Sequence, residues 1–276
     1  MPPAKQTPRS NKVDHQATVF VDADNTLWET DGVYARAQLA LLSDVESVIG
    51  LRTISNDRLF QVRDVDQAIA ERHHGGLRYP PRLLAQALAL MLTGSPQAAA
   101  IRRVLRDNEH GSALTPERAM AIEAAFMAAL KETPAPRLGV SRGLALLHSE
   151  RCLILIVTEG ARDRVTNTAE ILGLSPYVTR VIEAAKVTQL YRRVARLSHA
   201  PLPMFMVGDQ LQRDIAPAKA AGLRTVYFPS GFRPRWEPSE DAIQPDYRIS
   251  NFEQVPALVK ATLENRPWSP GSWASE

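Results

Sequence analysis

Three short runs of apolar, β-favouring residues constrain the fold of this chain more than any other feature. They cover residues 18–21, 152–157 and 204–207. Continuous apolar runs of this length are typical of strands that helices cover on both faces, as in a parallel sheet. Further strands are predicted at 178–182, 224–228 and 246–249, and helices at 141–149, 161–172, 186–197, 215–221 and 252–264. This alternation indicates an α/β fold with a parallel sheet.

A long helical segment interrupts the alternating pattern. Apolar periodicity predicts helices at 33–49, 56–70, 82–92, 95–105 and 115–131, and we expect no strand among them. Thr115 is a typical N-cap, and Pro116 suits the first helical position. A proline-rich linker at 133–136 returns the chain to the α/β pattern. We therefore predict a disordered leader at 1–16, an α/β core at 17–32 and 134–264, a helical domain at 33–133 and a flexible tail at 265–276.

Composition excludes several classes of protein. The 276 residues are 45% hydrophobic and 23% charged, which is typical of a globular protein with a packed core. The net charge is only +3 and the arginines are scattered, so we expect no nucleic-acid partner. We find neither a membrane-length apolar run nor a secretory signal, and we expect no membrane partner. Cys152, the only cysteine, lies in an apolar run, so we expect a buried, inert thiol and a cytoplasmic location. No sequence feature indicates an oligomeric state.

Polar residues follow the predicted strands at the point where each strand ends. The carboxyl ends of parallel strands lie at one edge of the sheet, so these side chains are expected to converge. The set combines carboxylates, one hydroxyl and one ammonium, which suits a magnesium ion together with a phosphate group. Gly208 is expected to let the backbone turn sharply beside the site. The residues concerned are Asp22, Asp24, Thr158, Lys186, Asp209 and Asp214.

Each of these residues also has an ordinary structural explanation. Thr158 could cap the helix that follows it, and Lys186 could be a solvated first-turn residue. Asp209 and Asp214 could be loop and N-cap residues. The order of the whole set along the chain, always at predicted strand ends, favours the functional interpretation.

These motifs resemble those of the haloacid dehalogenase-like superfamily, in its phosphatase branch. The four motifs are DADNT at 22–26, LILIVTEG ending at 160, Lys186 in EAAKVTQLYRRV, and GDQLQRD at 208–214. The resemblance implies a three-layer, Rossmann-like parallel sheet with an inserted all-helical cap. The helical segment matches the position and length of the C1-type cap. The interval between Thr158 and Lys186, about 28 residues, is too short for the other cap type.

The resemblance also implies roles for the motif residues. Asp22 resembles the nucleophile that forms an aspartyl-phosphate, and Asp24 the general acid and base. Thr158 and Lys186 would hold the transferring phosphoryl group. The metal site would hold Mg²⁺ through Asp22, the backbone carbonyl of Asp24, Asp209 and Asp214, the last of which could instead orient a ligand, a water or the lysine.

The implied activity is magnesium-dependent hydrolysis of a small phosphorylated metabolite. Asp24 disfavours dehalogenation, because the leaving group of that reaction needs no proton. A phosphomutase of the same superfamily and a non-catalytic binding protein that retains the fold are the alternatives.

Substrate contacts are expected from the loop at 28–31, from the second motif and from the helical domain. They are Trp28, Glu159, Gly160 and Arg78. Arg78 lies with Arg72, His73 and His74 in a glycine-broken loop, for which a solvated basic loop is the favoured interpretation and contact with an anionic or polar substrate the alternative.

Four residues depart from the family pattern. Asn25 stands where glycine is usual, although Asn accepts left-handed conformations, so the turn should survive. Glu159 replaces a small or amide residue, and it should point away from phosphate or narrow the choice of substrate. Arg213 replaces an asparagine, and Val187 a proline.

Overall fold

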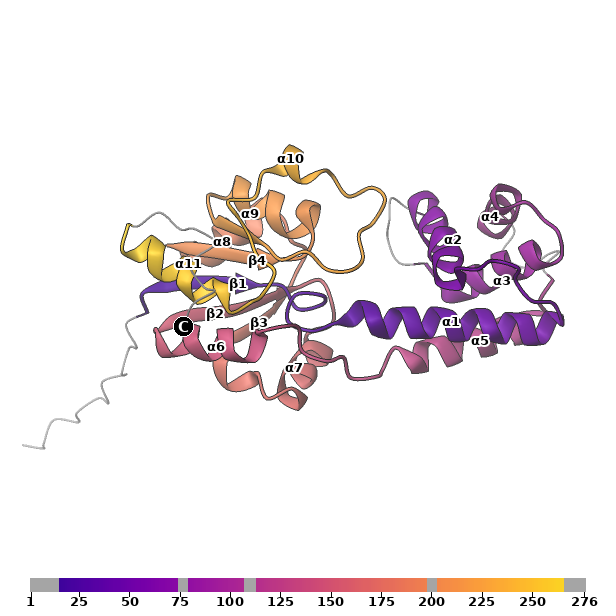
Figure 1. Ribbon diagram of the computed structural model, residues 1–276, viewed down its shortest axis with the longest axis horizontal. Helices are drawn as coiled ribbons and strands as arrows, with labels where there is room; N and C mark the ends of the chain where they lie inside the picture. Colours follow the sequence, from indigo (N-terminus) through magenta and orange to yellow (C-terminus); the bar gives the residue numbers. More distant parts are fainter. Residues whose placement is uncertain (1–14, 74–78, 107–112, 198–202, 266–276) are drawn as a thin grey trace, which may run out of the picture. The chain divides into compact units, whose positions relative to one another are not determined.

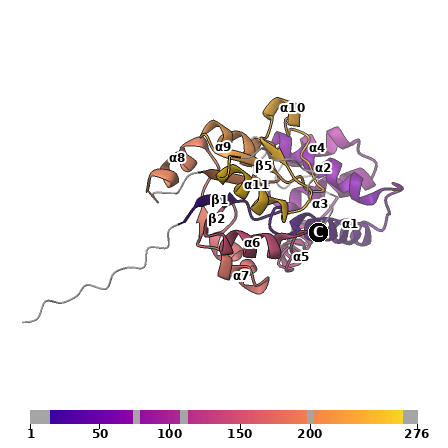
Figure 2. The ribbon, with the colours of Figure 1, turned by 60° about the vertical axis from the view of Figure 1, so that its left-hand side comes forward.

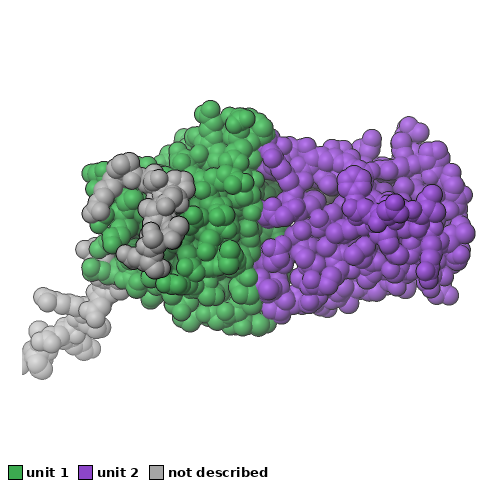
Figure 3. All heavy atoms as spheres, viewed as in Figure 1, with its two compact units in different colours: residues 1–27, 136–229, 239–276 green, residues 28–135, 230–238 purple. Residues whose placement is uncertain are grey.

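The computed structural model describes residues 15–73, 79–106, 113–197 and 203–265. The chain forms two compact units, which Figure 3 colours separately. An α/β unit comprises residues 1–27, 136–229 and 239–276, and a helical unit comprises residues 28–135 and 230–238. The predicted leader, except its last two residues, and the predicted tail, except its first, lie outside the described residues, as do His74 and Arg78.

The α/β unit contains a six-stranded parallel sheet. Its strands are β1 (Ala17–Val21), β2 (Cys152–Thr158), β3 (Arg180–Glu183), β4 (Met204–Gly208), β5 (Arg224–Tyr227) and β6 (Tyr247–Arg248). They are ordered β3-β2-β1-β4-β5-β6. The first strand therefore lies between β2 and β4 (Figure 1), and Figure 2 shows β1 and β2 side by side from another direction. Val21 is aligned with Ile156 and Val207. This confirms the predicted parallel α/β fold.

Helices cover both faces of the sheet. Alternate side chains such as Phe20, Leu155 and Met206 form one buried cluster with Tyr191 of α8 (Thr188–Leu197) and Ala218 of α9 (Ala216–Ala220). On the other side, α6 (Val140–Ser149) packs against α11 (Gln254–Leu263), as Figure 1 shows. Helix α7 (Arg162–Ile171) packs beside β3. Because both faces are covered, every residue of β1 and β2 is buried.

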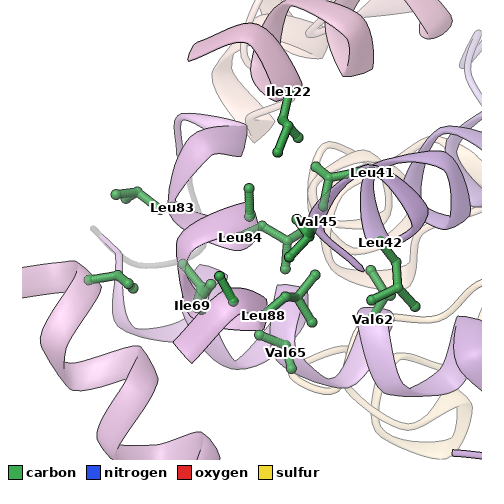
Figure 4. Close-up of a cluster of buried hydrophobic side chains, with 14 of the residues drawn as sticks. Leu41, Leu42, Val45, Val62, Val65, Ile69, Leu83, Leu84, Leu88 and Ile122 are labelled. Carbon is green, nitrogen blue, oxygen red and sulfur yellow. The ribbon is translucent and has the colours of Figure 1, made fainter. Parts of the chain in front are cut away.

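Among the described residues of the helical unit, five helices precede the proline-rich linker. They are α1 (Thr30–Ile49), α2 (Arg58–Arg72), α3 (Pro81–Leu92), α4 (Gln97–Arg106) and α5 (Pro116–Ala129). Their apolar faces form one core, in which Leu42, Val65 and Leu84 lie close together (Figure 4). Thr115 caps α5 through the backbone N–H of Arg118, as predicted. No strand occurs among the described residues of 33–133.

The segment 230–238, which follows β5 in the sequence, belongs to the helical unit rather than to the core. Arg235 donates to the carboxylate of Asp64 and, through its backbone N–H, to Gln67, both on α2. The guanidinium of Arg63 lies 5.2 Å from the ring centre of Phe232. These contacts attach the segment to α2.

Several element boundaries differ from the sequence-based expectation. Helix α8 begins at Thr188, so Lys186 lies in the preceding loop instead of within the helix. Helix α9 follows a π-helical turn, Leu211–Ile215, which contains Asp214. A short helix, α10 (Glu240–Ile243), was not predicted. None of the described helices has the length and apolarity needed to cross a membrane.

Candidate active site

Adjacent strands bring the predicted polar residues together at one edge of the sheet. Asp22 follows β1, and its backbone N–H donates to the carbonyl of Val207 on β4 at 2.9 Å. Thr158 is the last residue of β2, and Asp209 comes directly after β4. All three side chains are buried. The sheet register therefore confirms that these residues converge.

Lys186 contacts two carboxylates in this buried cluster. Its Nζ donates to Oδ1 of Asp22 and, at 2.6 Å, to Oδ1 of Asp214. The side chains of the lysine and of these two aspartates are all at most 7% exposed. Burial alone would lower the pKa of Lys186, but the two carboxylates outweigh it and raise the pKa above its ordinary value. The lysine therefore stays charged.

Asp22 has an unusually high pKa for a carboxyl group. Burial raises the pKa of Asp22 from 3.8 to about 7, against the opposing effect of Lys186, and Asp214 adds to the rise. Thr26 donates to the second oxygen, Oδ2, of Asp22 at 3.1 Å. Asp22 thus lies in a cluster that carries more negative charge than its single ammonium can offset.

Asp214 reaches the cluster from the π-helical turn after β4. Its Oδ2 accepts from the backbone N–H of Gln210 at 2.9 Å, which leaves Oδ1 for Lys186. Gly208 makes room for this side chain, because a Cβ at position 208 would lie 2.3 Å from Cβ of Asp214. Gly208 lies within β4 and is not among the glycines with positive φ, so its role is this close approach and not the predicted sharp turn.

Three carboxylates form a group that could hold a metal ion. Oxygens of Asp22, Asp209 and Asp214 lie within 4.8 Å of one another, and all three residues are buried. Clustered carboxylates repel one another unless a cation or proton offsets their charge, and hard cations such as Mg²⁺ and Ca²⁺ prefer oxygen ligands. The residues present therefore fit a divalent hard cation.

Asp24 lies outside that carboxylate group and is bound by an arginine. Both oxygens of its carboxylate accept from the guanidinium of Arg164 in the first turn of α7, one of them at 3.1 Å. The turn directly after Asp24 contains Asn25 with a φ of 59°, so the predicted left-handed conformation is confirmed. Asp22 and Asp24 are therefore close in sequence but have different partners.

The loop after β2 holds the other polar groups. The backbone N–H of Gly160 donates to Oγ1 of Thr158 at 2.9 Å. A Cβ at position 160 would lie 2.6 Å from Nη2 of Arg164, so the glycine also makes room for that arginine. Glu159 pairs with Arg213 through Oε2 at 2.7 Å, and its Oε1 accepts from the backbone N–H of Lys186 at 3.3 Å.

Three arginines outside the predicted set of site residues support this edge of the sheet. Arg164 binds Asp24, and Arg213 binds Glu159. Arg137 donates to the backbone carbonyls of Asn25, Phe228 and Pro229, which joins the loop after β1 to the end of β5. No local sequence signal predicts their contacts, because each contact joins segments that are distant in sequence.

The predicted substrate contacts are only partly placed by the structure. Glu159 and Gly160 lie beside Thr158 as described above. Trp28 belongs to the helical unit, and its side chain is fully buried. Arg78 lies outside the described residues. A role of any of them in substrate binding stays a prediction.

Comparisons with known proteins agree with the fold and the motifs. A family model described as haloacid dehalogenase-like hydrolase matches residues 16–222. A phosphoserine phosphatase from Thermus thermophilus is 26% identical over 161 residues, which cover 55% of this chain and 62% of that protein. The alignment thus spans less than two thirds of the relative.

Two solved structures share the fold across most of their length. A haloacid dehalogenase-like family hydrolase from Xanthomonas campestris gives a TM-score of 0.58 at 21% identity, covering 91% of this chain and 97% of that one. The structure of the HAD-hydrolase YfnB from Bacillus subtilis, bound to magnesium, gives a TM-score of 0.59 at 17% identity and covers 89% of this chain and 99% of that one. The chain belongs to the haloacid dehalogenase-like hydrolase family.

Proposed function

We propose that this protein is a magnesium-dependent phosphomonoesterase that hydrolyses a small phosphorylated metabolite through an aspartyl-phosphate on Asp22. One observation supports this most directly. Asp22 is buried against Lys186, whereas Asp24, two residues later, lies outside the metal-type carboxylate group. Two carboxylates in different environments can divide nucleophilic and proton-transfer roles between them.

Asp22 would supply the attacking oxygen. Thr26 and Lys186 each contact one of its two oxygens, so the carboxylate is held in one orientation. A fixed nucleophile avoids the cost of ordering it during the reaction. The Oγ of Thr158 and the ammonium of Lys186 would bind oxygens of the phosphoryl group, whose negative charge the lysine would offset.

Asp24 would handle the proton. It would protonate the leaving alcohol when Asp22 is phosphorylated and then accept a proton from the water that hydrolyses the aspartyl-phosphate. Arg164 would have to release part of its hold during the first of these steps, because a carboxylate bound by a guanidinium is stabilised in its ionised form. A carboxylate at this position also favours an oxygen leaving group over a halide.

Asp22, Asp209 and Asp214 would hold Mg²⁺, together with the backbone carbonyl of Asp24. The ion would neutralise charge on the phosphoryl group and on the carboxylates around it. We also propose that the helical unit is a C1-type cap that sets substrate choice through Arg78 and the loop at 28–31. A cytoplasmic location would suit a chain whose single thiol, Cys152, is buried.

A screen of purified protein against phosphate monoesters tests this function. The panel should include phosphoserine, sugar phosphates and a phosphorylated two-carbon acid, each with Mg²⁺ and with EDTA. We expect phosphate release that needs Mg²⁺ and is lost in Asp22→Asn. Exposed Asp241 on α10 gives the matched control, since Asp241→Asn should keep full activity.

Other outcomes would assign a different function. Isomerised sugar phosphate without phosphate release would indicate a phosphomutase. Tight binding of an ester with no turnover, unchanged in Asp22→Asn, would indicate a non-catalytic binding protein. Either result would refute the phosphomonoesterase.

A further inference from the structure

Two residues that depart from the family pattern are bonded to each other. Glu159 stands where a small or amide residue is usual, and Arg213 stands where asparagine is common. Nη1 of Arg213 lies 2.7 Å from Oε2 of Glu159, although the two residues are 54 positions apart in sequence. Two unusual residues of opposite charge in direct contact are best explained together.

The carboxylate of Glu159 joins three segments of the site. Its Oε2 binds Arg213, which immediately precedes Asp214 in the π-helical turn. Its Oε1 accepts from the backbone N–H of Lys186 at 3.3 Å. Glu159 itself follows Thr158 directly. The side chain of Glu159 thus connects the three segments that carry the hydroxyl of Thr158, the ammonium of Lys186 and the carboxylate of Asp214.

The position of the Lys186 backbone limits where its ammonium can lie. Lys186 precedes α8 by two residues, so helical hydrogen bonds do not fix its N–H. Instead, this N–H donates to Oε1 of Glu159. A small shift of this backbone would move Nζ away from Asp214, which it contacts at 2.6 Å.

The pair also removes a charge conflict. A lone carboxylate next to Thr158 would repel a phosphoryl group, but the guanidinium of Arg213 neutralises it at close range. The two side chains are 36% and 43% exposed, and an ion pair this exposed adds little to folding stability. Its importance therefore lies in where it holds its neighbours.

We propose that Glu159 and Arg213 form a positioning pair that holds Lys186 and Asp214 in place for phosphoryl transfer. This proposal rests on the proposed function. It also replaces the expectation that Glu159 contacts the substrate. The pair acts through Lys186 and Asp214 and does not touch the reacting atoms.

A double-mutant cycle tests the pair. We expect Glu159→Ala and Arg213→Gln each to lower kcat about 10-fold, the low end of the effect for residues that orient a site from behind. KM should change less than about twofold. Both substitutions break the same contact between Glu159 and Arg213. The kcat of the double variant should therefore also fall about 10-fold rather than about 100-fold. Arg213→Lys keeps the charge and should stay within about threefold of the wild type.

Hydrogen exchange gives a readout that does not depend on turnover. Loss of the Glu159 acceptor should speed exchange of the Lys186 amide at least about fivefold, as measured by NMR, and Arg213→Gln should speed it as well. The matched control is Glu240→Ala, which breaks the similarly exposed pair between Glu240 and Arg248 in the same unit. This control should change neither kcat nor exchange at Lys186.

Three results would overturn the positioning pair. The first is an unchanged kcat in both single variants, and the second is a pair of losses in kcat that multiply in the double variant. The third is an effect on KM alone, which would make Glu159 a substrate contact. If the wild type hydrolyses no ester, the proposed function fails. Exchange at Lys186 then decides alone whether the pair holds that backbone.

Discussion

The buried ammonium of Lys186 provides the most informative perturbation of this site. Lys186→Met keeps the length and apolar stem of the side chain but removes the charge that contacts Asp22 and Asp214. These three side chains are 6%, 7% and 1% exposed, so water cannot replace the lost partner. Removing one member of a buried ion pair costs about 3–5 kcal/mol. At about 2–4 °C per kcal/mol, we expect Tm to fall by about 6–20 °C.

The stability lost in Lys186→Met should be larger at high pH than at low pH. Burial raises the pKa of Asp22 from 3.8 to about 7, so between these values the folded state binds a proton that the unfolded state has released. Stability therefore falls as pH rises through this window. Lys186→Met removes the charge that opposes the rise in pKa. The penalty should be near its full size at pH 8 and clearly smaller at pH 5, where the carboxyl groups can take up protons.

Thermal unfolding followed by circular dichroism in EDTA, at pH 5 and pH 8, measures this difference. The control is Lys260→Met, which changes an exposed lysine on α11 and should alter stability by less than about 0.5 kcal/mol. A Lys186→Met variant that loses less than about 1 kcal/mol at pH 8, or that loses equally at both pH values, would refute the reasoning.

Three further substitutions test other parts of the site. Gly208→Ala places a Cβ against the side chain of Asp214, so the free energy of unfolding measured in urea should fall by about 1–3 kcal/mol. Wild-type stability would contradict the packing argument. Arg164→Ala removes the guanidinium that orients the carboxylate of Asp24, so kcat should fall about 10-fold or more in steady-state kinetics. A change below twofold would show that this contact is dispensable. Asp209→Asn should weaken Mg²⁺ binding at least about 10-fold in calorimetric titration, and unchanged affinity would remove Asp209 from the metal site.

The sheet and the convergence of its polar edge could be predicted from sequence because both depend on local signals. Continuous apolar runs identify buried strands, and the geometry of parallel strands places their carboxyl ends together. Asp22, Thr158 and Asp209 therefore follow from pattern alone. The turn at Asn25 was also predictable, since few other residues accept a positive φ.

The remaining features arise from contacts between segments that are distant in sequence. Nothing near Arg164 indicates that it will bind Asp24, 140 positions earlier. The attachment of 230–238 to α2 likewise depends on Arg235 meeting Asp64. The start of α8 also differs from the expectation, because the helix begins at Thr188 and the backbone N–H of Lys186, in the preceding loop, donates to Glu159, 27 positions earlier. The role of Gly208 depends on a side chain from a π-helical turn, a conformation that local propensity does not reveal.

The central place of β1 in the sheet sets an order for folding during synthesis. β1 emerges first, but it pairs with β2 from Ala17↔Cys152 onward and with β4 from Thr18↔Met204. At about 5–20 residues per second, the roughly 135 residues between the first pair take about 7–27 s to be made. The apolar β1 must therefore wait unpaired while the helices of 28–135 form their local contacts. The nascent chain is exposed to misassociation at the strand that directly precedes Asp22, so a chaperone bound near the ribosome would protect β1 before any other strand.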